Sequence, residues 1–102
     1  MEKRKPSYDL EAFKDACGSV NTIRITRTAQ ISARHLGFDL DDVAAVIRSM
    51  NRRMFYKSMT SFADHTAWHD VYHVPAEGAL IIYLKFTMDT VIDFMILSFK
   101  EK

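Results

Sequence analysis

Residues 80–88 read LIIYLKFTM, and this stretch decides the fold class because its apolar residues recur at every second position. The apolar set is Leu80, Ile82, Leu84, Phe86 and Met88. Tyr83 and Lys85 alternate with that set, so the stretch is typical of a strand with one apolar face and one polar face. The apolar face needs a cover of helices, and the polar face is then open or lines a groove.

Alternating patterns continue on both sides of this stretch. They predict strands over residues 54–59, 68–74, 80–88 and 91–100. The expected connections are a polar loop at 61–66, a turn at 75–78 and a turn at Asp89-Thr90. Because consecutive strands with short connections pair antiparallel, we expect one antiparallel sheet. Ile23 and Ile25 also alternate with polar residues, which indicates a short strand or an extended link.

The first half of the chain has the spacing of helices. Ser7, Thr26 and Asp39 are the expected N-caps of three helices, and Gly18 and Gly37 follow the first two. The expected buried positions are Leu10, Phe13 and Cys17, then Ala29, Ala33 and Leu36, then Val43, Val46, Ile47 and Met50. Helices followed by strands predict an α+β fold, with the N-terminal helices packed on one face of the antiparallel sheet.

Size and charge limit the possible classes of protein. A chain of 102 residues suits a single domain covering 1–102. The net charge of +1 excludes a global basic field, so any nucleic-acid binding needs a local patch. Two basic clusters are candidates: Lys3, Arg4 and Lys5, and Arg48, Arg52, Arg53 and Lys57.

Targeting and redox signals are few. The charged opening MEKRKP leads into no apolar stretch, and no apolar run approaches the roughly 20 residues that cross a bilayer. Cys17 is the one cysteine, so an intramolecular disulfide is excluded and burial in the core is expected. We therefore expect a cytoplasmic protein with no membrane partner.

Motifs for cofactors and metals are missing from the sequence. There is no Walker A loop, GxGxxG, GxSxG or HExxH. His69 and His73 are four residues apart, which on a strand separates them by about 13 Å, too far to chelate one ion. We expect neither a metal nor a cofactor.

Several blocks of sequence together resemble one family. They are FYKSMTSFADHTAWHDVY at 55–72, IYLKFT at 82–87, SFKEK at 98–102, MEKRKP at 1–6 and LGFDLDD at 36–42. These blocks span nearly the whole chain and resemble the MqsR family of messenger-RNA-cleaving toxins. The resemblance implies a RelE-like α+β fold with a curved sheet, and cleavage of single-stranded mRNA at short GC-containing sites without metal or ribosome. It also implies inhibition of translation and growth, and neutralisation by an MqsA-type antitoxin.

The resemblance also implies site residues. Lys57 of FYK, Tyr83 of the YLK strand and Lys100 of SFKEK match functional positions of the family. The family's glutamine in WQDVY is His69 here, because this chain reads WHDVY. That departure leaves the role of position 69, and with it the sequence preference, open.

Metal-free RNA cleavage needs those residue types. The 2′-hydroxyl must lose a proton, the phosphorane charge must be stabilised, and the leaving 5′-oxygen must gain a proton. We expect Lys57 and Lys100 to bind phosphate, Tyr83 to position RNA or donate a hydrogen bond, and His69 to transfer protons. Lys85 and Arg53 are further candidates for substrate binding.

Two other readings of the sequence stay open. Residues 28–48 have the Ala, Gly and Val spacing of a DNA-binding helix-turn-helix, although Asp39, Asp41 and Asp42 would repel phosphates there. A non-catalytic interaction module that pairs through a sheet edge is the second. Tyr56 adjoins Lys57 and, by strict alternation, is expected to point to the opposite face and into the core.

Overall fold

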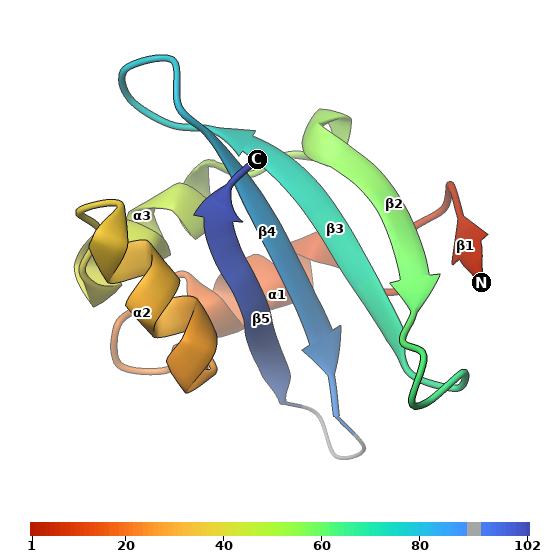
Figure 1. Ribbon diagram of the computed structural model, residues 1–102. Coiled ribbons are helices and arrows are strands. Elements are labelled where there is room, and N and C mark those ends of the chain that lie inside the picture. The colour runs from red at the N-terminus through yellow and green to blue at the C-terminus, as the bar shows by residue number, and fades with distance from the viewer. Residues whose placement is uncertain (90–92) are drawn as a thin grey trace.

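A computed structural model describes residues 1–89 and 93–102 (Figure 1). The helices are α1 (Leu10–Cys17), α2 (Arg27–His35), α3 (Leu40–Ser49) and the 3-10 turn η1 (Arg52–Met54). The strands are β1 (Glu2–Lys3), β2 (Phe55–Thr60), β3 (Trp68–Pro75), β4 (Ile81–Met88) and β5 (Phe94–Glu101). They form one sheet in the order β1-β2-β3-β4-β5, with every neighbouring pair antiparallel. The predicted α+β fold is confirmed; Thr90 and the predicted start of the last strand at 91–92 lie outside the described residues.

Two of the three predicted helix caps are correct. The Thr26 hydroxyl accepts a hydrogen bond from Ala29 N at 3.2 Å. Asp39 and Asp42 form a reciprocal capping box, with bonds of 2.9 and 3.0 Å. The prediction for Ser7 is wrong.

Asp9 caps α1 in place of Ser7. The Asp9 carboxylate accepts from Ala12 N at 3.1 Å, while the hydroxyls of Ser7 and Ser58 share a hydrogen bond of 2.7 Å. Ser7 is therefore committed to a tertiary contact with β2, a competition that local sequence does not reveal.

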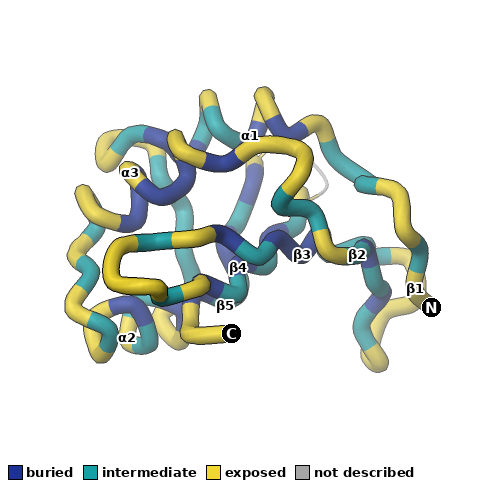
Figure 2. The backbone as a smooth tube through the Cα atoms, turned by 90° about the horizontal axis from the view of Figure 1, so that it is seen from above, coloured by how far each residue is buried: buried dark blue, intermediate teal, exposed yellow. Residues whose placement is uncertain are grey.

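The link between α1 and α2 lies along the outer edge of β5. Ile25 forms an isolated parallel bridge with Ile96. Ile96 N donates to Arg24 O at 2.9 Å, and Thr26 N donates to Ile96 O at 3.0 Å. Of the two alternatives for this segment, the extended link is correct. It sets α2 beside β5, as Figure 2 shows from above.

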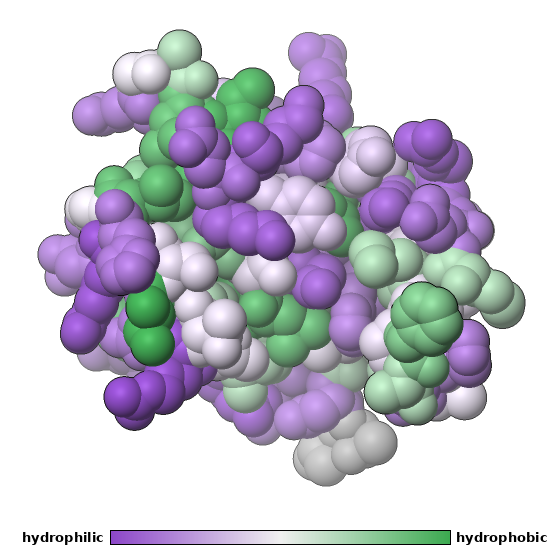
Figure 3. Space-filling model, in the orientation of Figure 1, coloured by the Kyte–Doolittle hydropathy of each residue, from purple (hydrophilic) through white to green (hydrophobic). Residues whose placement is uncertain are grey.

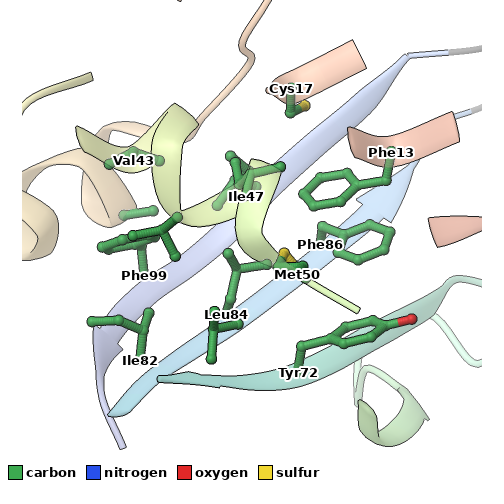
Figure 4. Close-up of a cluster of buried hydrophobic side chains, with 14 of the residues drawn as sticks. Phe13, Cys17, Val43, Ile47, Met50, Tyr72, Ile82, Leu84, Phe86 and Phe99 are labelled. Atoms are coloured by element: carbon green, nitrogen blue, oxygen red, sulfur yellow. The ribbon is translucent and has the colours of Figure 1, made fainter. Parts of the chain in front are cut away.

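The core fills the space between the sheet and the helices α1 and α3, which lie on one side of it (Figure 2). Phe13 of α1 stacks on Phe86 of β4, with ring centroids 3.7 Å apart and an interplanar angle of 4° (Figure 4). The predicted buried positions of the helices are buried except Leu36, which is half-buried, and Cys17 is 1% exposed. In the apolar set of residues 80–88, Ile82, Leu84 and Phe86 are buried, whereas Leu80 is half-buried and Met88, the last residue of β4, is 37% exposed. Each fully buried aliphatic or aromatic side chain stabilises the fold by about 1.5–3 kcal/mol.

One carboxylate is buried with the core and ties the N-terminal segment to the sheet. Asp70 of β3 is 0% exposed. Ser7 N donates to both of its oxygens at 3.0 Å, and Tyr8 N donates to Oδ2 at 3.0 Å. These three bonds satisfy the buried group and hold residues 7–8 against β3.

Strand β1 was not predicted. Glu2 pairs with Met59 and Lys3 pairs with Ser58, so β1 adds to the outer side of β2. Two residues are too short to show a period-2 pattern, which is why the sequence carries no signal for this strand.

Within the described residues, no helix has the length and apolarity that a membrane span requires.

Candidate active site

The side of the sheet opposite α1 carries most of the predicted site residues. Figure 1 looks onto this face, and Figure 3 shows mostly hydrophilic and weakly hydrophilic side chains over its middle, with some hydrophobic ones among them. We call it the open face and define it by Lys57, His69, Tyr83, Lys85 and Lys100. Strand pairing aligns them: Lys57 and Lys85 both lie opposite Val71, Tyr83 lies opposite Lys100, and His69 lies opposite Met59.

Tyr83 and Lys100 lie side by side on the open face. The Lys100 Nζ lies 5.2 Å from the centroid of the Tyr83 ring. Burial raises the pKa of Tyr83, and the charge of Lys57 acts in the opposite direction. The phenol therefore keeps its proton at neutral pH and can donate a hydrogen bond.

Lys57 is held by an acidic partner. Its Nζ donates to Glu2 Oε2 at 2.8 Å, and the side chains are 20% and 61% exposed respectively. This hydrogen bond raises the pKa of Lys57, with burial opposing it. The ammonium therefore stays charged at neutral pH, which suits a phosphate contact and excludes a role as a general base there.

His69 is half-buried on β3. Its Nδ1 is enclosed and has no hydrogen-bond partner in the described part of the chain. Burial, followed by the charge of Lys85, lowers the pKa of His69. The ring is thus neutral at pH 7 and can accept a proton, and Nε2 is the ring nitrogen left to meet a substrate.

The two substrate-binding candidates are placed differently. Lys85 lies in the middle of the open face, and burial together with the charge of Lys100 lowers its pKa. Arg53 lies in η1 outside the strands, so strand pairing does not align it with the other five residues. Its backbone N donates to Asn51 Oδ1 at 3.0 Å.

Tyr56 is on the open face, which makes the prediction of a core position wrong. The pairing shifts between Phe55 and Lys57, which lie opposite Tyr72 and Val71, so Tyr56 is the extra residue of a β-bulge. Tyr56 is 39% exposed, and its ring stacks on His73. Strict alternation assumes a regular strand, and the bulge breaks that assumption.

The sequence analysis missed three residues of this face: Glu2, Tyr56 and His73. His73 shares the period of His69 on β3, so alternation alone could have placed it there. Glu2 belongs to the short strand β1, and Tyr56 depends on the bulge, so neither had a sequence signal. Among residues 1–89 and 93–102, no group of three or more His, Cys, Asp or Glu is arranged to hold a metal ion.

Comparisons with known proteins agree with the resemblance described above. A family model described as "Motility quorum-sensing regulator, toxin of MqsA" matches residues 5–101. The mRNA interferase toxin MqsR of Escherichia coli (strain K12) is 42% identical over 102 residues, covering the whole of both chains. The chain therefore belongs to the MqsR toxin family.

Proposed function

We propose that this protein is the toxin of a type II toxin-antitoxin system and acts as an endoribonuclease. In this proposal it cleaves single-stranded mRNA at short GC-containing sites in the cytoplasm, without metal or ribosome, and so inhibits translation and growth. The similar Escherichia coli protein is named an mRNA interferase toxin, and the family description names MqsA as the toxin's partner. An MqsA-type antitoxin is accordingly the proposed partner.

The observation that carries this proposal is the grouping of Lys57, His69, Tyr83 and Lys100 on one face. They come from all four long strands, β2 to β5, and strand pairing aligns them. Lys57 and Tyr83 are close enough for the lysine charge to act on the pKa of the phenol. A cationic surface of this kind suits a phosphodiester, and aromatic rings suit the unstacked bases of single-stranded RNA.

The proposed reaction is attack of the 2′-oxygen on phosphorus, with breakage of the bond from phosphorus to the 5′-oxygen. His69 takes the proton of the 2′-hydroxyl, since its ring is neutral at pH 7. Lys57 and Lys100 stabilise the added negative charge on the phosphorane. Tyr83 donates a hydrogen bond to the leaving 5′-oxygen, which takes a proton from water, and His69 afterwards releases its proton to the solvent. The products are a 2′,3′-cyclic phosphate and a 5′-hydroxyl.

At position 69 this chain has a histidine where the family resemblance implies a glutamine. A histidine that acts as a base usually has its other ring nitrogen bound to a group that selects the tautomer. His69 has no such partner for Nδ1 in the described residues, so packing alone orients the ring. His69→Gln therefore tests this role directly.

The test is cleavage of a GC-containing single-stranded RNA in excess EDTA by the purified protein. The comparison is a Lys57→Ala, Tyr83→Ala double variant, with Lys14→Ala on α1 as a control lysine on the covered side of the sheet. Circular dichroism checks that each variant is folded. Sequence-limited cleavage by the parent and the control alone, leaving 2′,3′-cyclic phosphate ends, supports the nuclease.

No cleavage of several RNAs by folded parent protein would overturn the nuclease and favour the non-catalytic interaction module. The helix-turn-helix alternative has no support from the family match, although α2 and α3 lie where that reading expected helices. Gel-shift binding of duplex DNA by the parent would revive it.

A further inference from the structure

The N-terminal segment is fixed along the edge of the sheet beside β2. Thr60 N donates to Met1 O at 2.9 Å, and the Lys3 Nζ lies 4.2 Å from the centroid of a Trp68 ring. Arg4 Nη1 donates to Tyr56 O at 3.4 Å. Together with the bonds to Asp70, these contacts hold residues 1–8 in one place, so the backbone of Glu2 has a defined position.

That position is within the proposed nuclease site. Glu2 lies opposite Met59, and Met59 lies opposite His69, so the three side chains form one row across β1, β2 and β3 on the open face. The Glu2 carboxylate contacts the Lys57 ammonium at 2.8 Å. An ammonium has three N–H groups, so this contact leaves two for a phosphate.

We propose that Glu2 is a positioning residue for RNA cleavage, which holds the Lys57 ammonium on the open face in the orientation that the scissile phosphate needs. The inference rests on the proposed ribonuclease function and extends the site to β1. Lysine is a flexible four-carbon chain with no preferred direction of its own, so an anchored partner reduces the conformations that it loses in the transition state.

Glu2 favours cleavage by positioning Lys57, but its negative charge also acts against the binding of RNA. The hydrogen bond and charge of Lys57 lower the pKa of Glu2, so the carboxylate is ionised at neutral pH. A negative charge this close to a phosphate site repels RNA. Glu2 therefore lowers affinity for RNA while it raises the rate of cleavage, and a residue with only a structural role would not separate these two quantities.

The experiment compares Glu2→Gln with the parent, using an RNA that the parent cleaves and the same RNA with a 2′-deoxy nucleotide at the cleavage site. We expect the single-turnover rate to fall about tenfold, because a neutral amide holds the ammonium less firmly than a carboxylate. We expect the Kd for the uncleavable RNA to fall about threefold, because one repulsive charge is gone.

Glu11→Gln is the matched control. Glu11 is also an exposed carboxylate paired with a lysine, Lys14, at 3.8 Å, but it lies on α1. The Glu11→Gln substitution should leave both the cleavage rate and the Kd for RNA unchanged. A second arm places Glu2→Gln in the Lys57→Ala background, where it should cause no further loss of rate, because Glu2 acts through Lys57.

Two results would overturn the inference while leaving the nuclease intact. One is a Glu2→Gln rate equal to that of the parent. The other is a further loss of rate in the Lys57→Ala background, which would mean that Glu2 acts on RNA directly. A parent that cleaves no RNA would instead remove the proposed function, and this inference with it.

Discussion

The ring of Tyr56 lies against the imidazole of His73, with centroids 4.3 Å apart and an interplanar angle of 24°. On the other side of His73, the centroid of the Tyr83 ring is 6.0 Å away. Three rings from β2, β3 and β4 thus follow one another across the open face, with Lys57 close to the ring of Tyr56 and Lys100 close to the ring of Tyr83. The bulge at Tyr56 creates this row, since a regular β2 would send that ring into the core.

The row of rings predicts that Tyr56 contributes to RNA affinity by stacking. Tyr56→Ala should weaken binding of an uncleavable single-stranded RNA about tenfold, because stacking of one base on an aromatic ring contributes about 1–3 kcal/mol. Tyr56→Phe keeps the ring and should bind like the parent. Fluorescence anisotropy of a labelled RNA measures both. Equal losses for the two variants would mean that the hydroxyl, and not the ring, makes the contact.

Lys57 should contribute charge, which is separable from stacking by salt. Lys57→Ala should make the slope of log Kd against log salt shallower by about 0.7, the value for one phosphate contact with a single strand. Lys14→Ala on the covered side should leave the slope as it is. The measurement is a salt titration of RNA affinity, and an unchanged slope for Lys57→Ala would contradict a phosphate contact.

Protonation of His69 should set the acid limb of the profile of cleavage rate against pH. Its pKa is lowered from 6.5 by burial, so the ring is neutral at pH 7 and gains a proton only below that reference value. The proposed base is the neutral form, so the cleavage rate should fall as pH drops through the pKa of His69. His69→Gln has no group that titrates there and should lose this limb of the profile. A variant with full rate and an unchanged profile would rule out proton transfer by His69.

Replacing the buried Asp70 should destabilise the fold. Asp70→Asn turns one accepting oxygen into an NH₂ group, which faces the donor Ser7 N in either orientation of the amide, because Ser7 N donates to both carboxylate oxygens. We expect a loss of about 2–3 kcal/mol in the free energy of unfolding, the usual effect of breaking a buried hydrogen-bonded charge. Urea denaturation measures it. A loss below 0.5 kcal/mol, on the scale of ordinary surface substitutions, would show that the segment is held by its other contacts.

Replacing Tyr72 by phenylalanine should stabilise the protein. Its side chain is 0% exposed, and its hydroxyl has no partner among the residues that the structure describes. Burial raises the pKa of Tyr72 to about 12. Tyr72→Phe removes the unpaired hydroxyl and should raise the free energy of unfolding by about 1 kcal/mol. Thermal denaturation is the measurement. A clear loss of stability would mean that an ordered water binds the hydroxyl.

Individual residues show which features of the structure could be predicted from the sequence. Alternation in residues 80–88 placed Tyr83 and Lys85 on the face away from the helices, and the structure confirms that placement because β4 is a regular strand there. The cap at Asp39 was predictable because its partner Asp42 is three residues away. Ser7 was predicted wrongly because its partner Ser58 is 51 residues away. Glu2 was missed because its partner Lys57 is 55 residues away.

The sequence by itself determined the α+β class, the N-cap of α3 at Asp39, the buried stripes of the helices and which face of β4 is polar. All of these depend on residues a few positions apart, where period and local hydrogen bonding decide the outcome. Only the tertiary structure decided that Lys57, His69, Tyr83 and Lys100 share one face, that Tyr56 joins them and that Glu2 binds Lys57. Those relationships depend on strand order, on the bulge in β2 and on β1, which arise from contacts between distant segments.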